Sequence, residues 1–140
     1  MLHGDDLTYS LVVPRGCSFF SMTTRESYHV IHERIAMLLP LARTAESAGS
    51  INSDACFENV AQHDLLIAGQ KIAGAAQRRT RHGLLHQGSI QSAGADALRA
   101  LLAETLARHV DRRPLRADEV RAAALLARNR YASEAWLRRF

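Results

Sequence analysis

The sequence predicts a protein of the α+β class, in which an antiparallel sheet is combined with helices, and three observations support this. Residues 7–13 alternate between two faces, as in a half-buried strand. Residues 64–91 contain three strand-like runs separated by glycine-containing turns, which is typical of an antiparallel meander. From residue 95 onward, apolar residues recur at helical spacing.

The first strand places Leu7, Tyr9, Leu11 and Val13 on one face, and Pro14 stops it.

A helix is predicted to follow, because Thr23-x-x-Glu26 resembles a capping box. It should run to about residue 39, where Pro40 ends or kinks it. Its expected buried stripe is Tyr28, Ile31, Ile35, Leu38 and Leu39. Residues 45–54 are rich in Ser, Ala, Gly and Asn and predict a loop.

The predicted meander has its strands at residues 64–68, 71–78 and 84–91, with turns at 69–70 and 79–83. A helix is expected over 95–110, and Pro114 breaks it. Asp118 is the predicted N-cap of a further helix through about residue 130, and Ser133 caps one last turn. There is no sign of an internal repeat or an interdomain linker, so one domain is expected over 1–140.

Composition narrows the function classes. The 140 residues are 47% hydrophobic and 23% charged, and no apolar run is long enough for a membrane span. Two cysteines and no export signal predict a reducing cytoplasm. The net charge of +4 comes almost wholly from arginine, since only one of the 18 basic residues is lysine. Scattered arginines and 6% aromatics argue against nucleic acid, whereas an acidic protein partner fits the charge.

The single lysine, Lys71, falls in the second meander strand. Alternation would place Lys71, Ala73, Ala75 and Gln77 on one face, which makes a narrow apolar groove with one cation at its mouth. Gly74 weakens a strand, so close approach by a ligand or another backbone is expected there. A slim acyl chain would suit this groove, because a lysine ammonium can orient a carbonyl or phosphate oxygen. The alternative is a half-exposed lysine on an ordinary strand whose small residues pack against a helix.

Cys56 is a candidate acyl acceptor, because a thiolate is a strong nucleophile and a nearby cation such as Lys71 lowers its pKa. The alternative is a buried free cysteine. Cys17 is interpreted as structural or incidental. Cys56 with His63 does not form a recognised hydrolase signature.

No metal site is predicted. His82-x-x-x-His86 spans a turn, and His29-x-x-His32 lacks further ligands that would complete a site. Nothing matches a Walker loop or a dinucleotide fingerprint.

Five segments resemble a known family in the same order along the chain. They are residues 2–10 (LHGDDLTYS), 53–57 (SDACF), 64–78 (DLLIAGQKIAGAAQR), 83–90 (GLLHQGSI) and 129–136 (NRYASEAW). Together they resemble the biotin/lipoate A/B protein ligase family, in particular its lipoate–protein ligases and cysteine-type octanoyltransferases. The Gly-x-Lys-Ile-x-Gly-x-Ala-Gln run is fairly specific, whereas Cys-Phe alone is not.

The resemblance implies a class II biotin/lipoate ligase-like core, α+β, with a mixed, largely antiparallel sheet flanked by helices. It implies that Lys71 contacts the acyl carbonyl or acyl phosphate, and that Cys56 carries the acyl thioester. Together with the groove argument, the expected substrate-binding residues are His3, Asp64, Ala73, Gly74, Ala75, Gln77, His86, Gly88 and Ser89.

The implied reaction moves an octanoyl or lipoyl group from acyl carrier protein to the enzyme. The group then passes to a lysine of a lipoyl-domain protein, such as glycine cleavage protein H or the 2-oxoacid dehydrogenase E2 subunit. No covalent cofactor is expected, and lipoate or octanoate is the substrate. An ATP-dependent lipoate–protein ligase, using ATP and magnesium through an acyl adenylate, is the first alternative. A non-catalytic remnant or lipoyl-domain-binding module is the second.

The chain departs from the family pattern at three places. An arginine- and glycine-rich loop normally precedes the His3 region, so 1–140 is expected to be a partial catalytic domain. The usual Gln-His-Gly-Ser is here His86-Gln87-Gly88-Ser89, and exchanging neighbours in a strand exchanges the faces they occupy. Residues 59–62 replace a proline-containing loop after Cys56.

Overall fold

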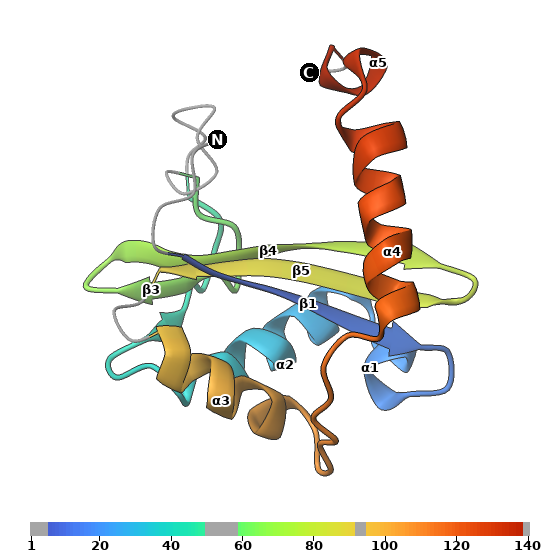
Figure 1. Ribbon diagram of the computed structural model, residues 1–140. Coiled ribbons are helices and arrows are strands. Elements are labelled where there is room, and N and C mark those ends of the chain that lie inside the picture. Colours follow the sequence, from blue (N-terminus) through green and yellow to red (C-terminus); the bar gives the residue numbers. More distant parts are fainter. Residues whose placement is uncertain (1–5, 50–58, 92–94, 139–140) are drawn as a thin grey trace. The chain divides into compact units, whose positions relative to one another are not determined.

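The computed structural model describes residues 6–49, 59–91 and 95–138. The chain divides into two compact units, Met1–His109 and Val110–Phe140. Among these described residues, the first unit contains a sheet and three helices, and the second contains helices and no strand (Figure 1). The predicted α+β class is therefore confirmed.

Five strands form a single sheet in the order β1-β5-β4-β3-β2. Their bounds are β1 Asp6–Pro14, β2 Arg43–Thr44, β3 Leu65–Ile67, β4 Gln70–Thr80 and β5 Gly83–Gln91. All four strand pairings are antiparallel, which confirms the meander of β3, β4 and β5. The sheet was expected to be mixed, and its described part is antiparallel throughout.

One face of the sheet carries three rows of paired residues. From β1 through β5 to β4, these rows are Leu7–Ile90–Ala73, Tyr9–Gly88–Ala75 and Leu11–His86–Gln77. The first row is apolar and lies in the hydrophobic core. The other two rows bring polar groups onto the same face, because neighbours across an antiparallel pair point the same way.

Helices cover this face. Figure 1 shows α2 (Thr24–Ala36) and α3 (Ala95–Leu106) on one side of the sheet, with the short α1 (Ser18–Ser21) beside them. The capping box is confirmed, since Thr23 and Glu26 exchange side-chain hydrogen bonds with each other's backbone N–H. The core consists of Leu7, Ile31, Ile35, Leu39, Leu65, Ala73, Ile90, Leu98 and Leu102. Burying each leucine or isoleucine stabilises the fold by about 1.5–3 kcal/mol relative to exposure.

The opposite face of the sheet is exposed at Val12 of β1. Val12 is 73% exposed there, and its neighbours on β1, Leu11 and Val13, point toward the helices.

The second unit holds α4 (Ala117–Leu126), a π-helical turn η1 (Ala127–Tyr131) and α5 (Glu134–Leu137). None of these segments contains a buried residue. The ring of Trp136 packs edge-on against Tyr131, with ring centroids 5.0 Å apart.

Several boundaries differ from the predictions. α1 and β2 were not predicted, because elements of four and two residues are too short to show periodicity. α2 and α3 end at Ala36 and Leu106, a few residues early. The predicted N-cap Asp118 is wrong. Arg116 is the N-cap, since its N–H is capped by the Glu119 carboxylate at 2.8 Å, while Asp118 pairs with the Arg116 guanidinium.

None of the helices in the described part of the chain has the length and apolar character needed to cross a membrane.

Candidate functional site

Lys71 lies at a β-bulge near the start of β4. Leu66 of β3 pairs with Lys71, but the preceding Leu65 pairs with Ala73. Ile72 is therefore an extra residue on β4, and a bulge of this kind interrupts the alternation of side chains between faces.

Because of the bulge, the prediction that Lys71 lies on the same face of the strand as Ala73 is wrong. Ala73 is 1% exposed and lies in the core, so it does not line a groove beside Lys71. Its neighbour Gly74 points to the opposite face. A Cβ built on Gly74 would lie 2.7 Å from Cε and 3.0 Å from Nζ of Lys71. The close approach expected at Gly74 is thus made by the Lys71 side chain itself.

The Lys71 ammonium is buried, and the Asp64 carboxylate and the Asn59 carbonyl hold it. Nζ lies 2.8 Å from Oδ2 of Asp64, and the two side chains are 9% and 1% exposed. Nζ also donates to the Asn59 carbonyl at 2.8 Å. A buried charge needs such partners to offset the loss of hydration. Lys71 is therefore not a half-exposed lysine on an ordinary strand.

The Asp64 carboxylate is fixed by further donors. Oδ2 accepts from the Ala61 N–H at 2.7 Å, and Oδ1 accepts from the Tyr28 hydroxyl at 2.5 Å. Ala61 and Asn59 both belong to the 59–62 segment that departs from the family pattern. That segment therefore supplies one contact to Lys71 and one to its counter-ion.

Tyr28 connects α2 to the edge of the sheet. Its oxygen accepts from the Ala75 N–H at 2.9 Å while its hydroxyl donates to Asp64. Burial raises the pKa of Tyr28, and the hydrogen bond to Asp64 raises it further, so the hydroxyl stays protonated. The sequence placed Tyr28 only in the buried stripe. Its aromatic body with a polar tip was the available sign of a second role.

Besides the Lys71–Asp64 pair, a hydrogen-bonded network of Gln77, His86 and Tyr9 lies on the helix side of the sheet. Nε2 of Gln77 donates to Nδ1 of His86 at 3.0 Å, and Nε2 of His86 lies 3.0 Å from the Tyr9 hydroxyl. His86 is fully buried, and its pKa is lowered to about 4 by burial and then by His32. The imidazole is therefore neutral at pH 7, and with Gln77 donating to Nδ1 its proton lies on Nε2.

The order His86-Gln87 decides which of the two residues is buried. His86 points into the core, whereas Gln87 is exposed and donates to the Ser10 hydroxyl at 3.2 Å. Gly88 accommodates Tyr9, because a Cβ on Gly88 would lie 2.5 Å from the Tyr9 hydroxyl oxygen.

The predicted site residues therefore divide between the two faces of the sheet. Asp64, Lys71 and Gly74 come together, and Ser89 pairs with Gly74 across β4 and β5. Gln77, His86 and Gly88 belong to the helix side, as does Ala75 through its side chain. His3 and Cys56 lie outside the described residues.

His32 is a buried histidine that sequence analysis considered only as a metal ligand. Its Nδ1–H donates to the His63 carbonyl at 2.6 Å, and Nε2 has no partner among the described residues. Burial lowers the pKa of His32 to about 4. Within residues 6–49, 59–91 and 95–138, no group of three or more His, Cys, Asp or Glu is arranged to hold a metal ion.

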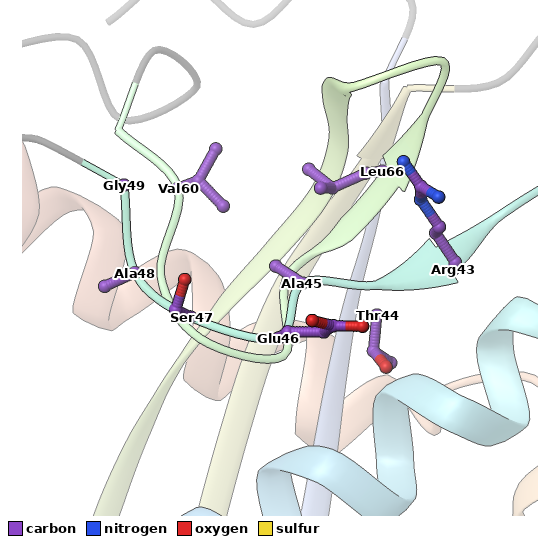
Figure 2. A pocket seen from close by; sticks show the side chains of 9 residues that line it. All are labelled: Arg43, Thr44, Ala45, Glu46, Ser47, Ala48, Gly49, Val60 and Leu66. Atoms are coloured by element: carbon purple, nitrogen blue, oxygen red, sulfur yellow. The ribbon is translucent and has the colours of Figure 1, made fainter.

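A cavity of about 420 Å³ opens beside β2 and β3 (Figure 2). Figure 2 shows the Arg43 and Leu66 side chains as neighbours, in agreement with their pairing across the two strands. The remaining lining residues are Thr44, Ala45, Glu46, Ser47, Ala48, Gly49 and Val60. Of the predicted site residues that the structure describes, none lines this cavity.

Proteins with similar sequences point to one family. Octanoyltransferase LipM of Staphylococcus aureus is 30% identical, over 64% of this chain and 37% of the relative. Octanoyltransferase LipM of Bacillus subtilis is 31% identical over the same shares. This chain therefore spans little more than a third of the length of these relatives.

Solved structures share the fold. Protein Ta0514 of T. acidophilum, solved with bound lipoic acid, superposes with a TM-score of 0.68 at 19% identity. The structure of lipoate-protein ligase A bound with ATP superposes with a TM-score of 0.64 at 21% identity. Each alignment covers 94% of this chain and 64% of the other. At such identities the likeness concerns the fold alone.

The family itself follows from a match of residues 1–94 to the family model described as "Biotin/lipoate A/B protein ligase family". This match contains the five described strands, Lys71 and its partners Asp64 and Asn59. The chain belongs to the biotin/lipoate A/B protein ligase family.

Proposed function

We propose that this protein acts in lipoate metabolism in the cytoplasm, transferring an octanoyl or lipoyl group to a lysine of a lipoyl-domain protein. The observation that carries the proposal is the buried ammonium of Lys71, held at 2.8 Å by both the Asp64 carboxylate and the Asn59 carbonyl. A fixed, desolvated cation is suited to stabilise negative charge that develops on an acyl oxygen. The names of the octanoyltransferase relatives support the same reaction class.

The proposed reaction runs in two acyl transfers. The Cys56 thiolate attacks the thioester carbonyl of an acyl carrier protein, forming a new carbon–sulfur bond as the carrier thiolate leaves and takes a proton. The acceptor lysine amine then attacks the enzyme thioester, forming an amide and returning the Cys56 thiolate with loss of a proton. In both steps Lys71 donates a hydrogen bond to the acyl oxygen. No covalently bound cofactor takes part.

The test uses octanoyl-loaded acyl carrier protein as donor and the glycine cleavage protein H or an E2 lipoyl domain as acceptor. Intact-mass spectrometry should detect one octanoyl group on the acceptor and a transient one on the enzyme. Lys71→Met should lower the transfer rate by about 10²–10³-fold, as for loss of one oxyanion donor. Cys56→Ala should abolish the enzyme adduct, whereas Cys17→Ala, at an exposed free cysteine, should retain it.

Other outcomes separate the alternatives. Transfer from free lipoate with ATP and magnesium that survives Cys56→Ala would favour the ATP-dependent ligase. Binding of the lipoyl domain without transfer from either donor would favour a non-catalytic binding module. Full activity of Lys71→Met with every donor would contradict the proposed role of Lys71.

A further inference from the structure

We propose that Tyr28 is a positioning residue for Lys71 and acts through Asp64. The Tyr28 hydroxyl and the Lys71 ammonium bond the two different oxygens of the Asp64 carboxylate. The hydroxyl thereby decides how the Asp64 carboxylate is oriented, and that carboxylate holds Lys71. This inference rests on the proposed function of Lys71 as the group that contacts the acyl oxygen.

The first step in the argument is the double hydrogen bond of the Tyr28 hydroxyl. It donates to Oδ1 of Asp64 at 2.5 Å and accepts from the Ala75 N–H at 2.9 Å. One bond fixes the oxygen against the backbone of β4, and the other directs its proton at the carboxylate. The hydroxyl is thus held at a defined point on the strand that also carries Lys71.

The second step concerns the carboxylate. With Oδ1 turned toward Tyr28, Oδ2 is left to accept from the Ala61 N–H at 2.7 Å and to pair with Lys71 at 2.8 Å. Asp64 is 1% exposed, so water cannot readily replace a lost donor. Without the Tyr28 hydroxyl, Oδ1 would lack that donor, and rotation of the carboxylate to find another would also move Oδ2 away from Lys71.

The third step is that Tyr28 is itself held. Its ring lies 4.2 Å from the ring of His32, one helical turn further along α2. The Nδ1–H of His32 donates to the carbonyl of His63, which adopts a φ of 71° immediately before Asp64. α2 therefore holds the turn that bears Asp64 through Tyr28, which bonds the Asp64 side chain, and through His32, which bonds the His63 backbone.

The test exploits the fact that Lys71 is the only lysine in the chain. A small amine-reactive reagent therefore labels Lys71 and the α-amino group alone, and peptide mass spectrometry separates the two. Tyr28→Phe should raise the labelling rate of Lys71 by about tenfold, the factor that corresponds to loss of one hydrogen bond to a charged group. The matched control is Tyr9→Phe, which removes another buried hydroxyl bonded to His86 and not to Asp64. It should leave Lys71 labelling within about twofold of the parent, because it removes no hydrogen bond from the Asp64 carboxylate.

Transfer kinetics give a second readout. In Tyr28→Phe, kcat for octanoyl transfer should fall by about tenfold while the KM for the acyl donor stays nearly constant, because the lost interaction acts in the transition state. A rise in KM with unchanged kcat would overturn the positioning role. Labelling needs no substrate, so altered Lys71 reactivity in a chain that transfers no acyl group would sink the proposed function and leave the Tyr28 inference standing.

Asp64→Asn keeps the inference testable should Tyr28→Phe not fold. It should raise Lys71 labelling at least as much as Tyr28→Phe, and adding Tyr28→Phe to it should have little further effect. Unchanged labelling in Asp64→Asn, or effects of the two substitutions that simply multiply, would overturn the inference.

Discussion

Replacing Gly74 with alanine should displace the Lys71 head while leaving the sheet intact. The added Cβ would lie 2.7 Å from Cε of Lys71 and 3.2 Å from Oδ1 of Asp64. Carbon atoms in contact normally stay about 3.5–4.0 Å apart, so Cε must move by about 1 Å. Gly74 is not among the glycines with positive φ, and alanine therefore fits its backbone.

The expected loss of stability in Gly74→Ala follows from the contacts that this movement breaks. Nζ lies 2.8 Å from Asp64, and a shift of about 1 Å takes it beyond hydrogen-bond distance. Leaving the Asp64 carboxylate buried without its cation costs about 3–5 kcal/mol. Alanine in a strand recovers about 0.5–1 kcal/mol relative to glycine. The free energy of unfolding should therefore fall by about 2–4 kcal/mol, and octanoyl transfer by about 10²–10³-fold.

Urea unfolding, Lys71 labelling and the transfer assay measure these effects in parallel. Gly49→Ala is the matched control, because its Cβ would meet Val60 at an ordinary 3.6 Å. It should change stability by less than about 1 kcal/mol, as surface substitutions usually do. If Gly74→Ala keeps parental stability and Lys71 reactivity, the lysine does not rest on Gly74 and the steric argument is refuted.

Three further predictions concern the rest of the fold. The pKa values of His32 and His86 are lowered to about 4 by burial, so between about pH 6.5 and pH 4 the unfolded chain binds more protons than the folded one. Stability should therefore fall as pH falls through this window, by up to about 3 kcal/mol per pH unit, and a flat profile in urea titrations would contradict it. Thr23→Ala removes the acceptor for the N–H at the third position of α2 and should cost about 1 kcal/mol by thermal unfolding, with Thr24→Ala as the control that leaves the cap in place. Gly88→Ala places a Cβ 2.5 Å from the Tyr9 ring and hydroxyl, and should cost about 1–3 kcal/mol. The cost should shrink when Tyr9 is also shortened to leucine, and an equal cost in both backgrounds would rule out this clash.

The regular elements were predictable wherever local pattern and packing agree. The Thr23 capping box starts α2, and Ile31, Ile35 and Leu39 are buried as their spacing predicts. The meander was predictable because its turns carry glycine, including Gly69 with a φ of 82°. The start of the second unit's first helix was mispredicted, because its N-cap is Arg116, a residue type that does not signal a cap, and the capping carboxylate is that of Glu119.

The sequence was a poorer guide to which face of the sheet each side chain occupies. Strict alternation put Lys71 with Ala73, but the bulge at Ile72 separates them, and no local signal in the sequence marked that bulge. Tyr28 was missed for a different reason, since its partners Asp64 and Ala75 lie 36 and 47 residues away along the chain.

By itself, the sequence determined that the protein combines an antiparallel meander with helices, and that its one lysine falls in the second meander strand. These features depend on neighbouring residues, whose periodicity and turn chemistry act locally. Only the tertiary structure decided that this lysine is buried against Asp64, and that a tyrosine from α2 orients the carboxylate. The physical reason is that burial and ion pairing depend on which distant segments meet, and that arrangement is fixed by packing rather than by spacing along the chain.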